Sequence, residues 1–150
     1  MALDGTQYWT TEDGTGDSVD GYSVSPRVGS IVQLTTQVNY DDMTDGGSTA
    51  GTLATTLDIP AGSVVLASRV DVVEGFTGDT SATMTVGDGS DADRYGSFDV
   101  FTGDVTKYDT PVGTADNAAK VDITVTVTSD SDFSDVEAGR AIITLVVLEG

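Results

Sequence analysis

Apolar and polar residues alternate with a period of two along much of this chain. In residues 31–40 the apolar side chains of Val32, Leu34 and Val38 share one face, with polar side chains on the other. Residues 121–127 place valine and isoleucine on one face and aspartate and threonine on the other. This pattern is typical of strands with one buried face. The chain is therefore predicted to consist of antiparallel strands.

The stretch 59–97 is predicted to form the centre of the fold. It contains an apolar run over residues 64–73 and an alternating run over residues 80–86. Residues 75–79, which include two glycines and an aspartate, separate the two runs. Strand-like runs joined by a short connection of turn residues are typical of a hairpin. We therefore expect the two runs to pair with each other.

The remaining runs complete an all-β prediction. Further strands are expected over residues 53–59 and around residues 98–101. Residues 141–148 are apolar at nearly every position, which predicts a central strand covered on both faces. Residues 103–120 are polar and rich in Gly, Asp and Thr, so they are predicted to be a long connection. Short strands without a convincing helix predict an antiparallel β-sandwich, with a jelly roll of eight strands as the expected form.

The domain organisation follows from length and local composition. A chain of 150 residues is expected to form one domain. Residues 1–25 are too polar to build a core, so they are predicted to be an extended N-terminal arm preceding a single sandwich domain over residues 26–150. The aromatic pair Tyr8 and Trp9 lies in this arm. Either the pair folds back onto the domain's own sheet, or it anchors the arm on a neighbouring subunit, as aromatic residues often do.

Charge narrows the possible partners. The chain has 25 acidic residues against six basic ones and a net charge of −19. Such a surface repels phosphate backbones and anionic bilayers, so neither nucleic acid nor membrane is an expected partner. The first residues lack a signal-peptide pattern, which predicts synthesis in the cytoplasm. The acid excess fits a halophilic setting, in which salt screens repulsion, and it equally fits a loop-rich protein kept in solution by charge.

The residue types present exclude most catalytic machinery. Without His or Cys the chain cannot form a Ser-His-Asp triad, a Cys-His pair or a histidine-based zinc site. The short glycine-rich segments at residues 14–16 and 87–89 lack the lysine of a phosphate loop. A hydrolase that uses two carboxylates is the enzyme class that remains open. We therefore predict that the protein is not an enzyme.

One acidic loop is a candidate metal site. Asp88, Asp91 and Asp93 lie close together in the sequence, and Asp79 is expected nearby across the predicted hairpin. Calcium prefers six to eight oxygen ligands from such loops, so Ca²⁺ is the one cofactor that this segment suggests. The alternative is a solvated turn in which the aspartates cap their own backbone.

Three segments within residues 57–97 resemble the head-decoration or head-fibre proteins of tailed viruses. They are Leu57–Gly62 (LDIPAG), Thr80–Asp88 (TSATMTVGD) and Asp91–Arg94 (DADR). The resemblance implies a non-enzymatic structural protein on the capsid exterior: a decoration, cement or turret subunit that forms a homo-oligomer. It also implies the major capsid protein and other virion subunits as partners. A haloarchaeal rather than a bacterial host is a further hypothesis that rests on the acid excess.

A second function remains open at this point. β-Sandwiches with aromatic side chains and acidic loops also serve as carbohydrate-binding or adhesion modules, some of them Ca²⁺-dependent. This alternative rests on analogy at the level of the fold. An exposed aromatic platform beside the candidate aspartates would favour it.

Overall fold

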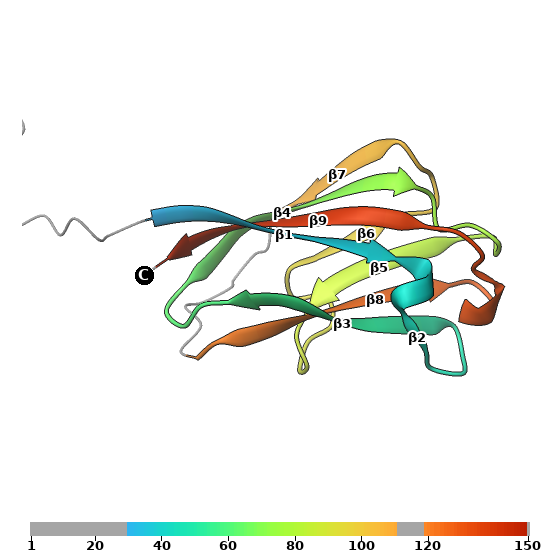
Figure 1. Cartoon of the computed structure of the whole chain (residues 1–150), viewed down its shortest axis with the longest axis horizontal. Helices are drawn as coiled ribbons and strands as arrows, with labels where there is room; N and C mark the ends of the chain where they lie inside the picture. Colours follow the sequence, from blue (N-terminus) through green and yellow to red (C-terminus); the bar gives the residue numbers. More distant parts are fainter. Residues whose placement is uncertain (1–29, 111–118, 150) are drawn as a thin grey trace, which may run out of the picture.

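The computed structural model describes residues 30–110 and 119–149, which form two antiparallel sheets packed face to face (Figure 1). Two short 3₁₀ helices, η1 (Tyr40–Asp42) and η2 (Phe133–Asp135), lie in loops. No described helix is long and apolar enough to cross a membrane. The strands are β1 (Ser30–Asn39), β2 (Thr44–Asp45), β3 (Ala50–Ile59), β4 (Val64–Glu74), β5 (Ala82–Gly87), β6 (Gly96–Asp99), β7 (Val105–Asp109), β8 (Val121–Ser129) and β9 (Arg140–Glu149).

The order of the strands is that of a jelly roll. One sheet has the order β1-β9-β4-β7, and the other has the order β2-β3-β8-β5-β6. When the two-residue strand β2 is set aside, eight strands divide equally between two sheets, and strands distant in sequence are paired within each sheet. This is the double Greek-key arrangement of a jelly roll. The predicted all-β, antiparallel sandwich is confirmed.

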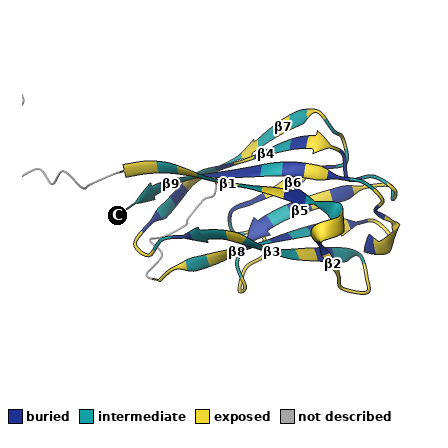
Figure 2. Ribbon diagram, in the orientation of Figure 1, coloured by how far each residue is buried: buried dark blue, intermediate teal, exposed yellow. Residues whose placement is uncertain are grey.

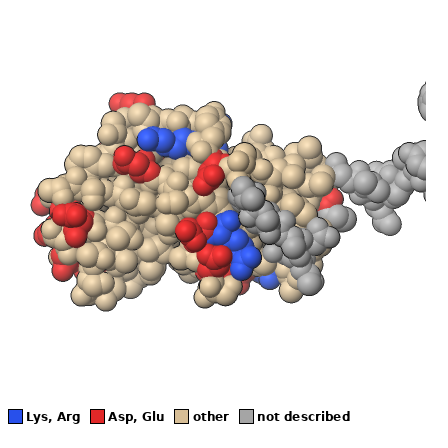
Figure 3. Space-filling model, turned by 180° about the vertical axis from the view of Figure 1, so that it is seen from behind, with Lys and Arg blue, Asp and Glu red and all other residues tan. Residues whose placement is uncertain are grey.

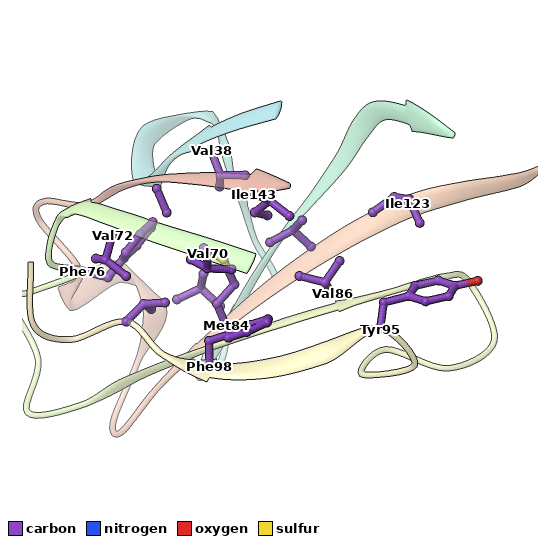
Figure 4. Packing of buried hydrophobic residues seen from close by; sticks show 14 of the residues in the cluster. Val38, Val70, Val72, Phe76, Met84, Val86, Tyr95, Phe98, Ile123 and Ile143 are labelled. Carbon is purple, nitrogen blue, oxygen red and sulfur yellow. The ribbon is translucent and has the colours of Figure 1, made fainter. Parts of the chain in front are cut away.

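The predicted central hairpin is wrong. Strand β4 pairs with β7 and β9, whereas β5 pairs with β6 and β8 in the other sheet. The connection over residues 75–81 therefore crosses from one sheet to the other. Phe76 fills this crossing with a fully buried ring, and its N–H donates to the carbonyl oxygen of Val100 at 2.9 Å (Figure 4). Apolar alternation reports one buried face but does not say which strand lies alongside.

Two further strand predictions need correction. The expected long connection over residues 103–120 contains strand β7, which pairs with β4 at the edge of its sheet. β9 is central, as predicted, because it lies between β1 and β4. It is not covered on both faces, however, because its outward side chains Ile142, Val146 and Leu148 are only half-buried. The outer surface of the four-stranded sheet is thus unusually apolar.

The core lies between the two sheets, where buried residues alternate with exposed or half-buried ones along the strands (Figure 2). Each fully buried Val, Ile or Leu side chain stabilises the fold by roughly 1.5–3 kcal/mol relative to an exposed one. Both sheets contribute to one continuous apolar cluster (Figure 4). Its fully buried aliphatic members include Val38, Ile59, Val70, Val86, Ile123, Val125, Val127, Ile143 and Leu145.

The two ends of the sandwich differ. One end, here called the loop end, consists of residues 40–49, 74–81, 99–104 and 130–140, which hydrogen-bond to one another between loops. At the opposite end Ser30 pairs with Glu149, so β1 begins and β9 ends side by side. Figure 1 shows this second end on the left, next to the C-terminus. Any segment that precedes β1 therefore enters at the end opposite the loop end.

Candidate functional site

Acidic side chains concentrate at the loop end. Arg140 is the single basic residue of the loop end. Figure 3, which views the molecule from behind, shows red side chains without blue neighbours at its left-hand end. Aspartate and glycine favour turns, and the turns that connect the strands at this end hold these acidic residues. The acidic residues of the loop end are Asp41, Asp42, Asp45, Glu74, Asp79, Asp99, Asp104, Asp130, Asp132, Asp135 and Glu137.

Asp79 holds two loops of the loop end together. Its Oδ2 atom accepts a hydrogen bond from the backbone N–H of Ser131 at 2.6 Å, and its Oδ1 atom accepts one from Thr80 at 2.7 Å. The hydrogen bond from Ser131 is the main cause that lowers the pKa of the Asp79 carboxyl below its ordinary value. The charged form of Asp79 therefore stabilises the contact between the two loops.

Asp132 caps the short helix η2 in the same loop. Its Oδ1 atom accepts the backbone N–H of Ser134 at 2.9 Å. Hydrogen bonding from Ser134 lowers the pKa of the Asp132 carboxyl. Capping of this kind is the ordinary structural use of aspartate at the start of a helical turn.

Asp88 organises the loop over residues 88–95 at the opposite end. Its Oδ1 atom accepts hydrogen bonds from the backbone N–H groups of Ser90 and Asp91, each at 2.8 Å, and Arg94 Nε lies 2.7 Å from Oδ2. Partial burial acts to raise the pKa of Asp88, but these hydrogen bonds and the Arg94 charge outweigh it and lower the pKa. Both oxygens of Asp88 are thus used within the loop.

The candidate metal residues are only partly brought together. Asp88, Asp91 and Asp93 share one loop, and the side chains of Asp91 and Asp93 are exposed. Asp79 precedes β5 and Asp88 follows it, so the six-residue strand separates them by roughly 20 Å. No group of three or more potential ligands that could hold a metal ion occurs in the part of the chain that is described. Calcium binding remains a prediction.

Two other expectations concern aromatic residues. Tyr8 and Trp9, with the rest of the proposed arm over residues 1–25, lie outside the described residues. Tyr95, the aromatic residue at the end of the Asp88 loop, is fully buried and so does not form an exposed platform there. Tyr108 is 72% exposed, but it lies on β7 in the other sheet.

Sequence reasoning missed an apolar outer surface. All four large hydrophobic residues that are exposed in the described part of the chain lie on the four-stranded sheet, in β1, β4 and β7: Ile31, Leu66, Val73 and Tyr108. Half-buried Val64, Val146 and Leu148 extend this surface. The near-continuous apolar run in residues 141–148 was the available signal, but it was attributed to burial on both faces.

Comparisons with known proteins give a fold and no family. No family model matches the chain, and no curated protein does. A chain of the cyanophage Pam1 capsid asymmetric unit is similar in structure, with a TM-score of 0.62 and 16% identity, covering 93% of this chain and 98% of that one. At this identity the likeness concerns the fold alone.

Two weaker structural neighbours were also found. One is a chain of the acidic stable capsid structure of Helicobacter pylori bacteriophage KHP30, with a TM-score of 0.48, 10% identity and coverage of 79% and 93% of the two chains. The other is the low-affinity xylan binding module CBM86 from Roseburia intestinalis, with a TM-score of 0.35, 12% identity and coverage of 77% and 95%. The statement about the fold rests on the Pam1 chain.

Proposed function

We propose that this chain is a non-enzymatic structural protein of a tailed-virus particle. In this proposal it binds the outside of the capsid as a decoration, cement or turret subunit and assembles as a homo-oligomer. The observation that carries the proposal is the likeness to a Pam1 capsid chain over nearly the full length of both chains. Because the likeness covers 98% of the Pam1 chain, it supports a structural role for the jelly roll as a whole.

The distribution of charge supports one orientation on the shell. The loop end carries eleven acidic residues and one basic one, so it would face solvent and keep particles apart by repulsion. The opposite end, where β1 begins at Ser30, would face the shell. In this orientation the segment containing Tyr8 and Trp9 is joined to the shell-facing end. Weak contacts from each copy would add up through symmetry.

Binding to empty shells tests the proposal. Purified protein is incubated at high salt with shells of its virus assembled without it, and bound protein is measured by co-sedimentation. We expect the wild type to bind saturably. The affinity should fall at least ~10-fold in a Tyr8→Ala/Trp9→Ala variant, since buried aromatic anchors dominate such interfaces. A matched Asp41→Asn/Asp42→Asn variant at the solvent-facing loop end should bind like the wild type. Absence of saturable wild-type binding would refute the proposal.

A further inference from the structure

Among the described residues, strand β1 is a long sheet edge with no strand beside it. It is the terminal strand of the four-stranded sheet, and its ten residues pair with β9 without any register shift. It contains no charged residue and no proline, the usual protections against edge-to-edge pairing. The other described edges are shorter: β2 has two residues, β6 has four, and β7 has five with Lys107 and Asp109 among them. The part of β3 that β2 leaves unpaired, residues 53–59, is also shorter, and it contains Asp58 and a register shift.

The side of the sandwich next to this edge is incompletely covered. Val32 and Leu34 of β1 and Leu53 and Leu57 of β3 pack against the core, yet all four remain half-buried. β3 contacts β1 between the two sheets, and beyond Gly51 and Thr52 it has no pairing with β2. The inward side chains Ala141, Ile143, Leu145 and Val147 of the central strand β9, by contrast, are fully buried. An additional strand beside β1 would cover this apolar seam.

The surroundings of β1 are nearly neutral in a strongly acidic molecule. On the outer faces of β1 and β9, between Ile31 and Gln37 and between Ile142 and Leu148, no acidic residue occurs. Asp71, which lies on β4 opposite Ile142 of β9, pairs with Arg69 at 2.9 Å. A second copy of this chain, which carries the same negative charge, would meet the least repulsion here.

We propose that the free edge of β1 pairs antiparallel with β1 of a second copy across a two-fold axis. The apolar faces of the two strands lie on the same side of the sheet only when each even-numbered residue is paired with another even-numbered one. A register centred on Thr35 satisfies this condition: Val32 faces Val38 of the second copy, and Gln33 faces its Gln37. The isologous pair continues the sheet through both copies. This inference goes beyond the role on the shell proposed above and does not require shell binding. Because the paired copies run antiparallel, the loop end of one copy lies beside the opposite end of the other, so the pair belongs to the protein free in solution.

The same geometry gives the dimer a salt dependence. Asp41 and Asp42 lie in η1, just beyond the end of β1, and Glu149 pairs with Ser30 at its beginning. Antiparallel pairing brings the end of one β1 to the beginning of the other, so these carboxylates approach one another across the two-fold axis. Salt screens such exposed charges. The dimer should therefore be tighter at molar sodium chloride than at low salt.

Sedimentation equilibrium of the full chain without shells tests the inference. The wild type should dimerise, and a Gln33→Glu/Gln37→Glu variant should raise the dissociation constant more than ~10-fold, because like charges then face each other. A Gln33→Lys/Gln37→Glu variant, which places opposite charges across the axis, should restore dimerisation. The matched control Thr52→Glu/Thr128→Glu adds the same charge at exposed positions on the other sheet and should behave like the wild type. Thermal melting confirms that each variant is folded.

Three results would overturn the interface. The first is a wild type that stays monomeric at high concentration in molar salt. The second is an equal effect of the Gln33/Gln37 and Thr52/Thr128 variants. The third is a dimer or larger oligomer that survives the Gln33→Glu/Gln37→Glu change but is lost in Tyr8→Ala/Trp9→Ala, which would assign assembly to the N-terminal segment. A monomeric protein that still saturates shells would refute this inference alone.

Discussion

The Asp79 carboxylate accepts the backbone N–H of Ser131 at 2.6 Å and thereby ties the β4–β5 connection to the β8–β9 loop. The two residues are far apart in sequence. Each of their loops connects one sheet to the other, and both loops lie at the loop end. Further backbone hydrogen bonds run alongside, from Thr77 N–H to the Ala138 carbonyl at 3.2 Å and from Glu137 N–H to the Thr77 carbonyl at 2.8 Å. Asp79 contributes an ionisable side chain to this junction, whereas Thr77, Glu137 and Ala138 contribute backbone groups.

The first prediction concerns acid stability. Because the pKa of Asp79 is lowered in the folded chain, its contribution is present above the unfolded pKa of about 3.9 and is lost as the pH falls through the folded pKa. Asp79→Asn should therefore lower the melting temperature at neutral pH, and its difference from the wild type should shrink below about pH 4.

The control for this prediction is Asp130→Asn. Asp130 is exposed in the same loop, so its substitution removes an equal charge without removing the hydrogen bond from Ser131. Melting curves of the three proteins between acidic and neutral pH make the comparison. A constant difference between Asp79→Asn and the wild type across that range would contradict the assigned role.

The second prediction concerns the sheet crossing. Phe76 is fully buried, and a Cβ atom built at Gly139 would collide with the Cγ and Cδ2 atoms of its ring. Phe76→Ala should destabilise the fold by about 3–5 kcal/mol, as expected for a buried aromatic residue. Gly139→Ala should also destabilise, because of this collision and because its φ of 148° favours glycine. Urea denaturation gives the free energy of unfolding of each variant.

A double-mutant cycle separates the two effects at Gly139. Removing the Phe76 ring relieves the collision but not the backbone strain. The double variant should therefore be more stable than the sum of the single effects predicts, by more than about 0.5 kcal/mol. Strict additivity would mean that the ring and Gly139 do not contact in solution.

Strand positions were the part of the fold most readable from sequence. The runs over residues 31–40 and 121–127 each have one apolar face, and both are strands with that face toward the core. Pairing was less readable, because residues 64–73 and 80–86 look alike whether they share a sheet or face each other across the core. The buried ring of Phe76 fills the crossing between the two sheets, and its burial depends on residues distant in the sequence. The crossing could therefore not be predicted from residues 64–86 alone.

Edge strands and loops gave the weakest signals. Strand β7 was missed because Val105, Lys107 and Asp109 are only half-buried, so no continuous apolar face marks it. In the candidate loop, the alternative in which an aspartate caps its own backbone could be stated from sequence, and Asp88 does so. The position of Asp79 was predicted wrongly, because that prediction depended on a hairpin that the structure does not contain.

The third prediction concerns the Asp88 loop. Asp88→Ala removes the acceptor for Ser90 and Asp91 and the ion-pair partner of Arg94, so it should cost about 1 kcal/mol of stability. The loosened loop should also expose the peptide bond after Arg94, and trypsin should cut there faster. Asp91→Ala is the matched control, because its exposed side chain makes none of these contacts in the loop. Equal cleavage rates in both variants would argue against Asp88 as the organising residue.

The fourth prediction concerns salt and folding. Eleven acids against Arg140 at the loop end repel one another, and salt screens exposed charges, so sodium chloride should raise the melting temperature. Neutralising Asp41 and Asp42 to Asn should raise the melting temperature at low salt and flatten its salt dependence. In the control, Asp58→Asn/Asp122→Asn, the removed acids pair with Lys120 at 3.0 and 2.9 Å, so the same charge change should give no such gain. A melting temperature independent of salt would count against both the self-repulsion and a halophilic setting, which is one of the two interpretations that fit the acid excess.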